Sequence, residues 1–143
     1  MRNALLVVTG GPGDWRTSHR LDGHALECVA VHPDEPNRVF CGTFDAGLQR
    51  SLDGGDTWER VGEDVTQDAV MTAAINPDDP DEVWVGTEPS RVYHSADGGE
   101  SWDHRDGLVD LPSAPRWSFP PRPHTHHVRW IEVDPSDPER LYV

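Results

Sequence analysis

The stretch Ser51-Leu-Asp-Gly-Gly-Asp-Thr-Trp58 decides the fold, because it recurs 44 residues later as Ser95-Ala-Asp-Gly-Gly-Glu-Ser-Trp102. A longer upstream stretch keeps the same spacing: Val29-Ala-Val-His-Pro-Asp-Glu-Pro-Asn-Arg-Val-Phe-Cys-Gly-Thr43 recurs as Ala73-Ala-Ile-Asn-Pro-Asp-Asp-Pro-Asp-Glu-Val-Trp-Val-Gly-Thr87. Because the shift is constant, no insertion or deletion separates the two units. A period of this length is typical of repeat architectures, in which each unit buries its apolar face against its neighbours.

A third unit begins at Val128 and follows the same pattern as Ile131-Glu-Val-Asp-Pro-Ser-Asp-Pro-Glu-Arg-Leu-Tyr-Val143. Pro135 lies 58 residues after Pro77, so 14 additional residues lie between the second and third units. The third unit stops where the earlier units continue with Gly-Thr. We therefore expect the chain to be a fragment of a longer repeat protein.

Each unit is predicted to form four short strands, because short apolar or alternating runs are separated by turns rich in Pro, Asp, Asn and Gly. Four strands repeated every ~40 to 50 residues are the signature of a propeller blade. In the first unit the predicted strands are Cys28–Val31, Val39–Thr43 and Leu48–Ser51, and Trp58 opens the fourth strand. In the second unit they are Thr72–Ile75, Val83–Thr87 and Val92–Ser95, and Trp102 opens the fourth strand.

The Ser-x-Asp-Gly-Gly-x-Thr/Ser-Trp motif resembles the Asp-box, or BNR repeat, of sialidase-like propellers, and the resemblance extends from Leu26 to Val143. It implies an all-β propeller of four-stranded blades with Asp-box hairpins, with about three blades present and the ring incomplete. The resemblance places the box between the third and fourth strands, away from the ligand face. Its glycines supply positive φ, its Asp accepts backbone N–H groups, and its Trp packs below the turn. The residues with this structural role are Ser51, Asp53, Gly54, Gly55, Thr57, Trp58, Ser95, Asp97, Gly98, Gly99, Ser101 and Trp102.

The repeat divides the chain into five segments. Ala4–Gly10 and Trp15–Ser18 are predicted to be the second and third strands of the blade that closes the ring. The segments are residues 1–24 with these closing strands, 25–69 with the first Asp-box, 70–106 with the second, 107–127 as a Pro/His-rich insert, and 128–143 as the truncated start of the next blade.

The composition is strongly acidic. The chain has 143 residues, of which 26 are acidic and 12 basic, a formal net charge of −14, and all the basic residues are Arg. This charge repels nucleic-acid phosphates and anionic membranes, so neither is expected as a partner. An acidic surface without Lys favours a protein dissolved in concentrated salt, although codon usage in a GC-rich organism would also replace Lys by Arg. We expect a halophilic source.

The N-terminus and the cysteines bear on the compartment. The apolar run Ala4–Val8 is too short for the core of a signal peptide or for a membrane span. Cys28 and Cys41 are expected to be free, buried thiols. Together these features predict a cytoplasmic protein.

The insert contributes to the candidate ligand face, because in a propeller the loops that join successive blades lie opposite the boxes. Its prolines predict a stiff, extended segment, and its aromatic and Arg side chains offer stacking and anion pairing. Its histidines would suit a divalent metal, but on an extended chain only His124 and His126 share a side, so neither a metal site nor a cofactor is predicted. The candidate residues are Phe44, Asp45, Glu88, Arg91, Trp117, Arg122, His124, His126, His127, Arg129 and Glu132.

Glu132 takes the inner-strand place that Ala30 and Ala74 hold in the earlier units. A carboxylate there must be paired or face the central channel. The two interpretations are a polar group that lines a ligand pocket and a local ion pair with Arg129 or another Arg.

Two functions fit the sequence. The first is a propeller that binds a small-molecule, glycan or protein ligand without catalysis, similar to the WD40/YVTN/BNR-like group and to propellers of the photosystem II assembly-factor type; the remaining blades of the same ring are its expected partners. The second is a glycoside hydrolase, as the resemblance to sialidases and xyloglucan-cleaving enzymes implies, with catalytic residues mostly in further blades. The early Phe/Tyr-Arg-Ile-Pro motif of sialidases is absent, and the nearest text is Trp15-Arg-Thr-Ser18. No catalytic set is identified, so the binding module is favoured.

Overall fold

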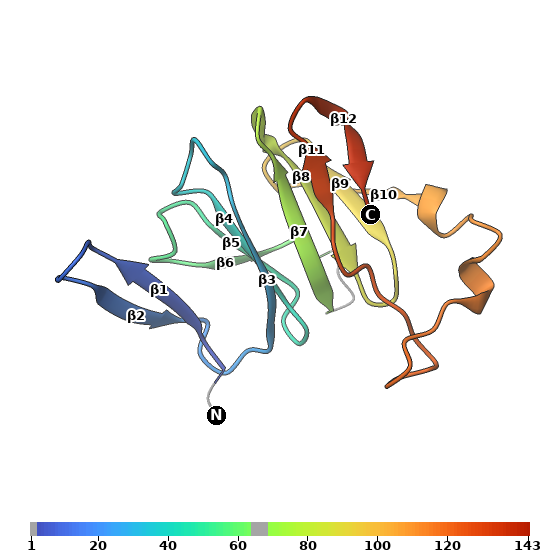
Figure 1. Cartoon of the computed structure of the whole chain (residues 1–143), viewed down its shortest axis with the longest axis horizontal. Helices are drawn as coiled ribbons and strands as arrows, with labels where there is room; N and C mark the ends of the chain where they lie inside the picture. The colour runs from blue at the N-terminus through green and yellow to red at the C-terminus, as the bar shows by residue number, and fades with distance from the viewer. Residues whose placement is uncertain (1–2, 64–68) are drawn as a thin grey trace.

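The computed structural model of the chain describes residues 3–63 and 69–143. Within them, two four-stranded antiparallel sheets lie between two separate hairpins (Figure 1). Each strand pairs with its neighbour in sequence, as in a propeller blade. The hairpins are β1 (Leu5–Thr9) with β2 (Arg16–Arg20), and β11 (Glu132–Asp134) with β12 (Asp137–Tyr142); the first blade is β3 (Leu26–Val31), β4 (Val39–Thr43), β5 (Leu48–Ser51) and β6 (Glu59–Val61), and the second blade is β7 (Val70–Asn76), β8 (Asp79–Thr87), β9 (Val92–Ser95) and β10 (Asp103–Arg105).

The strands predicted for the two blades are confirmed, and each fourth strand begins directly after Trp58 or Trp102. The turn between first and second strands differs between the blades. In the second blade the Asn76 side chain accepts a hydrogen bond from the Asp78 N–H at 2.9 Å, and strand β8 begins at Asp79. In the first blade the His32 ring accepts bonds from the Asp34 and Glu35 N–H groups, and strand β4 begins only at Val39.

The main core lies between the two blades. Phe40, Leu48 and Val61 of the first blade pack against Val70, Val83 and Val85 of the second. The Gly-Thr end of each second strand allows the inner strand of the next blade to come close. A Cβ at Gly42 would lie 2.7 Å from the Val70 carbonyl oxygen, and one at Gly86 would lie 2.6 Å from Val128 Cγ1. Gly at this point of the repeat is therefore a requirement of blade stacking.

The Asp-box hairpins have the predicted hydrogen bonds. Asp97 Oδ1 accepts bonds from the Ser101 N–H and the Ser95 hydroxyl at 2.9 and 2.8 Å, and Trp102 donates its indole N–H to the Gly99 carbonyl at 3.0 Å. The first box repeats this arrangement around Asp53. The pKa of each box Asp is lowered to about 2, mainly by hydrogen bonds from the residue four positions later. The hydroxyl of that residue, Thr57 or Ser101, has the largest effect, and its backbone N–H has the next largest. The paired glycines have positive φ, between 70° and 93°. These contacts are compatible with the structural role predicted for the box residues, which stays a prediction.

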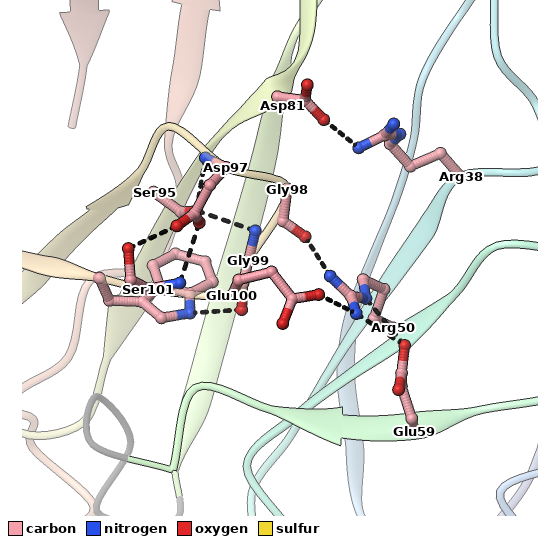
Figure 2. A network of polar contacts seen from close by, with 11 residues as sticks. Arg38, Arg50, Glu59, Asp81, Ser95, Asp97, Gly98, Gly99, Glu100 and Ser101 are labelled. Carbon is pink, nitrogen blue, oxygen red and sulfur yellow. Dashed lines mark hydrogen bonds and ion pairs between the residues drawn. The ribbon is translucent and has the colours of Figure 1, made fainter.

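An arginine of the first blade reaches into the box of the second (Figure 2). Arg50 donates to the Gly98 carbonyl at 2.7 Å, to Glu100 at 2.6 Å and to Glu59 of its own blade at 2.8 Å, and its side chain is only 8% exposed. Burial lowers the pKa of Arg50, but the bonds to Glu59 and Glu100 outweigh this and raise it. Above this contact, Arg38 pairs with Asp81 at 2.6 Å. We call the Arg50 contacts the blade clasp.

The two hairpins pack on the blades beside them. Val7 lies against Gly55, and Arg20 pairs with Asp56 at 2.8 Å, so the N-terminal hairpin meets the first box much as the first blade meets the second. Its strands overlap those predicted for the closing blade, and β2 continues to Arg20. Residues 1–2 and 64–68 lie outside the described residues, so the predicted segment boundary at 69 stays a prediction.

The insert, residues 107–127, is folded into turns, and the prediction of an extended segment is wrong. It contains a 3₁₀ turn at Ala114–Arg116. It then doubles back, because the Phe119 N–H donates to the Thr125 carbonyl and the Arg122 N–H donates to the Phe119 carbonyl, both at 2.7 Å. Proline needs no hydrogen-bond acceptor, so frequent prolines are compatible with tight turns closed by the residues between them. In Figure 1 the insert, in orange, extends to the right of the second blade and then turns down and back toward β11.

Candidate functional site

The insert lies at the opposite end of the blades from the Asp-boxes. Each box is bonded to the proline turn of its own blade, through Gly54 N–H to the Asn37 carbonyl and Gly98 N–H to the Asp81 carbonyl. The insert contacts the loops at the other end, between second and third strands, around residues 43–47 and 87–91. These loops and the insert form the face on which the sequence placed the candidate ligand residues.

An ion pair with a buried carboxylate holds the insert against both blades. Arg122 donates to Glu88 Oε2 at 2.8 Å, and His127 Nδ1 lies 3.4 Å from the same oxygen. The side chains of Glu88 and His127 are only 7% and 9% exposed. The Arg122 guanidinium also lies 5.0 Å above the ring of Phe44 and 5.5 Å above that of Phe119. Four predicted residues from three distant segments therefore meet in one cluster, which we call the insert latch.

Beside the insert latch is a hollow of about 620 Å³, the insert hollow. Three aromatic side chains, Trp117, Phe119 and Trp130, line it together with Arg116 and Arg129. His126 and His127 add two imidazoles, and no Asp or Glu of the described residues lines it. Its volume lies within the range of ligand pockets.

A second hollow of about 570 Å³ lies along the inner strands and is called the inner-strand hollow. It shares Arg129 and Trp130 with the insert hollow, and its two carboxylates are Glu27 and Glu132. Glu132 is exposed and accepts a hydrogen bond from the Trp130 indole N–H at 3.0 Å. The described partner of Glu132 is thus an indole N–H, and the interpretation of Glu132 as a residue that lines a ligand pocket stays a prediction.

The remaining predicted residues are distributed around this face. Asp45 accepts the Ala25 N–H at 2.9 Å, and this bond is the main reason why the pKa of its carboxyl is lowered. Arg91 and His124 are exposed. His126 accepts a weak bond from the Ser90 N–H at 3.4 Å and contacts the edge of Trp117. In the described part of the chain, no group of three or more His, Cys, Asp or Glu side chains is arranged to hold a metal ion.

One contributor was missed from the sequence. Arg116 and Phe119 belong to the insert, whose aromatic and Arg side chains were expected to offer stacking and anion pairing, but Trp130 was assigned no role. Trp130 is 67% exposed, unusual for so large an apolar side chain. In the repeat, Trp130 takes the position of Cys28 and Thr72, and both of these lie on the side of their strand that packs against the following unit.

The fold and the site define a set of Asp-box propeller blades with a loop-built face at the end opposite the boxes. Over residues 15–118 the chain matches the family of the photosynthesis system II assembly factor YCF48, and it belongs to this family. A search of curated proteins finds no significant match.

Solved structures share the fold. The GH74 enzyme of Niastella koreensis is 23% identical with a TM-score of 0.58, covering 72% of this chain and 18% of that one. The structure of YCF48 bound to D1 peptide is 14% identical with a TM-score of 0.56, covering 71% of this chain and 33% of that one. The GH74 xyloglucanase of Xanthomonas campestris is 19% identical with a TM-score of 0.51, covering 65% and 18%. The chain thus spans a third or less of the length of these proteins.

The structure also bears on membrane insertion and the thiols. Among the described residues, no helix is long and apolar enough to cross a membrane. Cys28 and Cys41 are both free, Cys41 buried and Cys28 half-buried. Burial is the largest cause that raises the pKa of these thiols, to about 11 and about 12.

Proposed function

We propose that this chain is part of a polypeptide-binding propeller and that its binding face is built by the insert and the loops beside it. The observation that carries the proposal is the insert latch. A surface loop is pre-organised when Arg122 pairs with the buried carboxylate of Glu88 and stacks on two aromatic rings, and pre-organisation reduces the entropy lost on binding.

Membership of this family supports the proposal that the ligand is a protein. One solved relative is described as bound to D1 peptide, which is a property of that protein. Our proposal extends only the class of ligand, a polypeptide, to this chain. The insert hollow offers aromatic side chains and arginines, the residue types that are enriched at the centres of protein interfaces.

The test is a screen of the purified chain against an array of short peptides of varied composition, followed by titration calorimetry of the peptides that bind. The Arg122→Ala variant releases the insert, so we expect it to weaken binding by about tenfold or more. Arg16→Ala is the matched control, since Arg16 lies in the N-terminal hairpin with its side chain 78% exposed. If no peptide binds, or if releasing the insert leaves affinity unchanged, the proposal is wrong.

A glycoside hydrolase is the second candidate, and one observation favours it. Glu27 and Glu132 line the inner-strand hollow together with the exposed indole of Trp130, a surface on which a sugar ring can stack. Glycosidases use two carboxylates that flank the scissile bond. Turnover of aryl glycosides or xyloglucan oligosaccharides that is lost in Glu27→Gln or Glu132→Gln would establish this function in place of the first.

We also propose that the protein works in a salt-rich cytoplasm. The net charge of −14 supports the proposal of a salt-rich environment, because salt screens the mutual repulsion of acidic side chains. Two free thiols support a reducing compartment. The salt proposal predicts that the melting temperature rises as KCl increases toward molar concentrations, and a melting temperature that falls over this range contradicts it.

A further inference from the structure

We propose that the insert hollow recognises an acidic peptide segment that carries a large apolar side chain. The proposal rests on the proposed function and adds the chemical class of the ligand. It concerns the site lined by Arg116, Trp117, Phe119, Arg129 and Trp130.

The charge of the hollow is opposite to that of the chain. Acidic residues outnumber basic ones by 26 to 12 in the sequence, yet each charged side chain among the described residues that line the hollow is an arginine. Glu88, a buried carboxylate 3.4 Å from the lining residue His127, is paired with Arg122. Arg116 and Arg129 are exposed, so their guanidinium groups are available to a ligand. An arginine pair surrounded by an acidic surface concentrates positive potential at one place, where carboxylates are attracted and cations are not.

The aromatic side chains give the hollow an apolar floor. The indole N–H of Trp117 donates to the Ser113 hydroxyl at 3.2 Å, and that of Trp130 donates to Glu132 at 3.0 Å. Because both indole donors are already bonded, the rings present apolar surface to a ligand. An apolar side chain that enters this space is placed between aromatic rings, while neighbouring carboxylates can reach the arginines at the rim.

A peptide is the favoured acidic ligand. A nucleic acid carries a phosphate at every nucleotide and is repelled by the net charge of −14 beyond the hollow. A short peptide can concentrate two or three carboxylates near the arginines and also supply an aliphatic or aromatic side chain. An acidic oligosaccharide supplies carboxylates without that side chain, so the floor of Trp117, Phe119 and Trp130 favours the peptide.

The test compares three fluorescent peptides of the same length around one central Phe, with flanking Asp and Glu, the corresponding Asn and Gln, or Lys. Fluorescence anisotropy with the full chain is expected to rank them acidic, then amide, then basic, with about tenfold between the first two. Arg116→Gln and Arg129→Gln should each weaken the acidic peptide by about threefold to tenfold and leave the amide peptide almost unchanged. Trp130→Ala should weaken both peptides.

Two controls and three outcomes decide between explanations. Arg16→Gln and Trp15→Ala change an exposed arginine and a Trp that is 61% exposed, both in the N-terminal hairpin, and should leave binding unchanged. If acidic and amide peptides bind equally, this inference is wrong but the proposed function stands. If no peptide binds, both fail. If an oligogalacturonate binds the hollow and the acidic peptide does not, the ligand is a glycan and this inference is wrong.

Discussion

Breaking the blade clasp tests whether the two blades are coupled through the Asp-box. The change is Arg50→Met, which keeps the length of the side chain and removes its charge and hydrogen bonds. Three acceptors lose their donor: the Gly98 carbonyl at 2.7 Å, Glu100 at 2.6 Å and Glu59 at 2.8 Å. The two carboxylates are 68% and 56% exposed and can turn to water, so their loss costs little. The Gly98 carbonyl, in a buried residue, cannot.

The loss of stability expected for Arg50→Met follows from this difference between the exposed carboxylates and the buried carbonyl. An unsatisfied buried carbonyl costs about 1–3 kcal/mol, and the two exposed ion pairs add about 0.2–1 kcal/mol each. We expect Arg50→Met to lower the free energy of unfolding by about 2–3 kcal/mol in total. For a chain of this length that lowers the melting temperature by roughly 5–12 °C.

A double-mutant cycle separates coupling between blades from local loss. Glu100→Gln removes the partner in the second blade, and Glu59→Gln removes the partner in the first. Because Arg50 joins Glu100 across the blade interface, urea unfolding of Arg50→Met, Glu100→Gln and the double variant should show a coupling energy of about 0.5–1 kcal/mol. If Arg50→Met costs less than about 0.5 kcal/mol, the blade clasp does not couple the blades, and if the two effects simply add, the Arg50–Glu100 pair contributes no coupling.

Three further predictions concern the boxes, the stacked strands and the thiols. The pKa of Asp97 is lowered from 3.8 to about 2, so its contribution to stability is present above pH 4 and is lost as the pH falls toward 2. The Asp97→Asn variant should therefore flatten the acid part of a plot of melting temperature against pH without abolishing ligand binding. An acid transition that is unchanged in this variant would contradict the prediction. Gly42→Ala places a Cβ 2.7 Å from a backbone carbonyl of the next inner strand and should lower the free energy of unfolding, measured in urea, by about 1–3 kcal/mol. Gly107→Ala is the control, because no atom lies within 4 Å of its added Cβ, and it should lower this free energy much less. Equal losses in the two variants would refute the close-packing argument. The pKa values of Cys28 and Cys41, about 11 and about 12, predict that neither thiol reacts with Ellman's reagent at pH 8 until the protein is unfolded, and rapid reaction of the native chain would disprove this.

The blades were predictable because the interactions that form them are local. The bonds to Asp97 come from Ser95 and Ser101, two and four residues away. Strands joined by short turns pair with their neighbours in sequence, so the antiparallel order follows once the strands are found. The 44-residue period then places the second blade from the first.

The insert was predicted less well because its conformation depends on distant groups. Proline content suggested an extended chain, but the Arg122–Glu88 pair joins residues 34 positions apart and its stacking partner Phe44 comes from the other blade. Four candidate residues named from the sequence do meet there. That Trp130 joins Arg116 in lining one hollow became visible only when both segments were placed in space.

The sequence by itself determined the strands and the box hairpins, since each follows from spacing within one unit, and the resemblance to propellers then implied the face that carries the insert. The tertiary structure decided how the units are joined. Arg50 and His94 occupy the same position of the repeat, yet Arg50 reaches the next box while His94 pairs with Glu82 of its own blade. The physical reason is that local hydrogen bonds are set by positions along the chain, whereas contacts between blades depend on which side chains converge once the sheets stack.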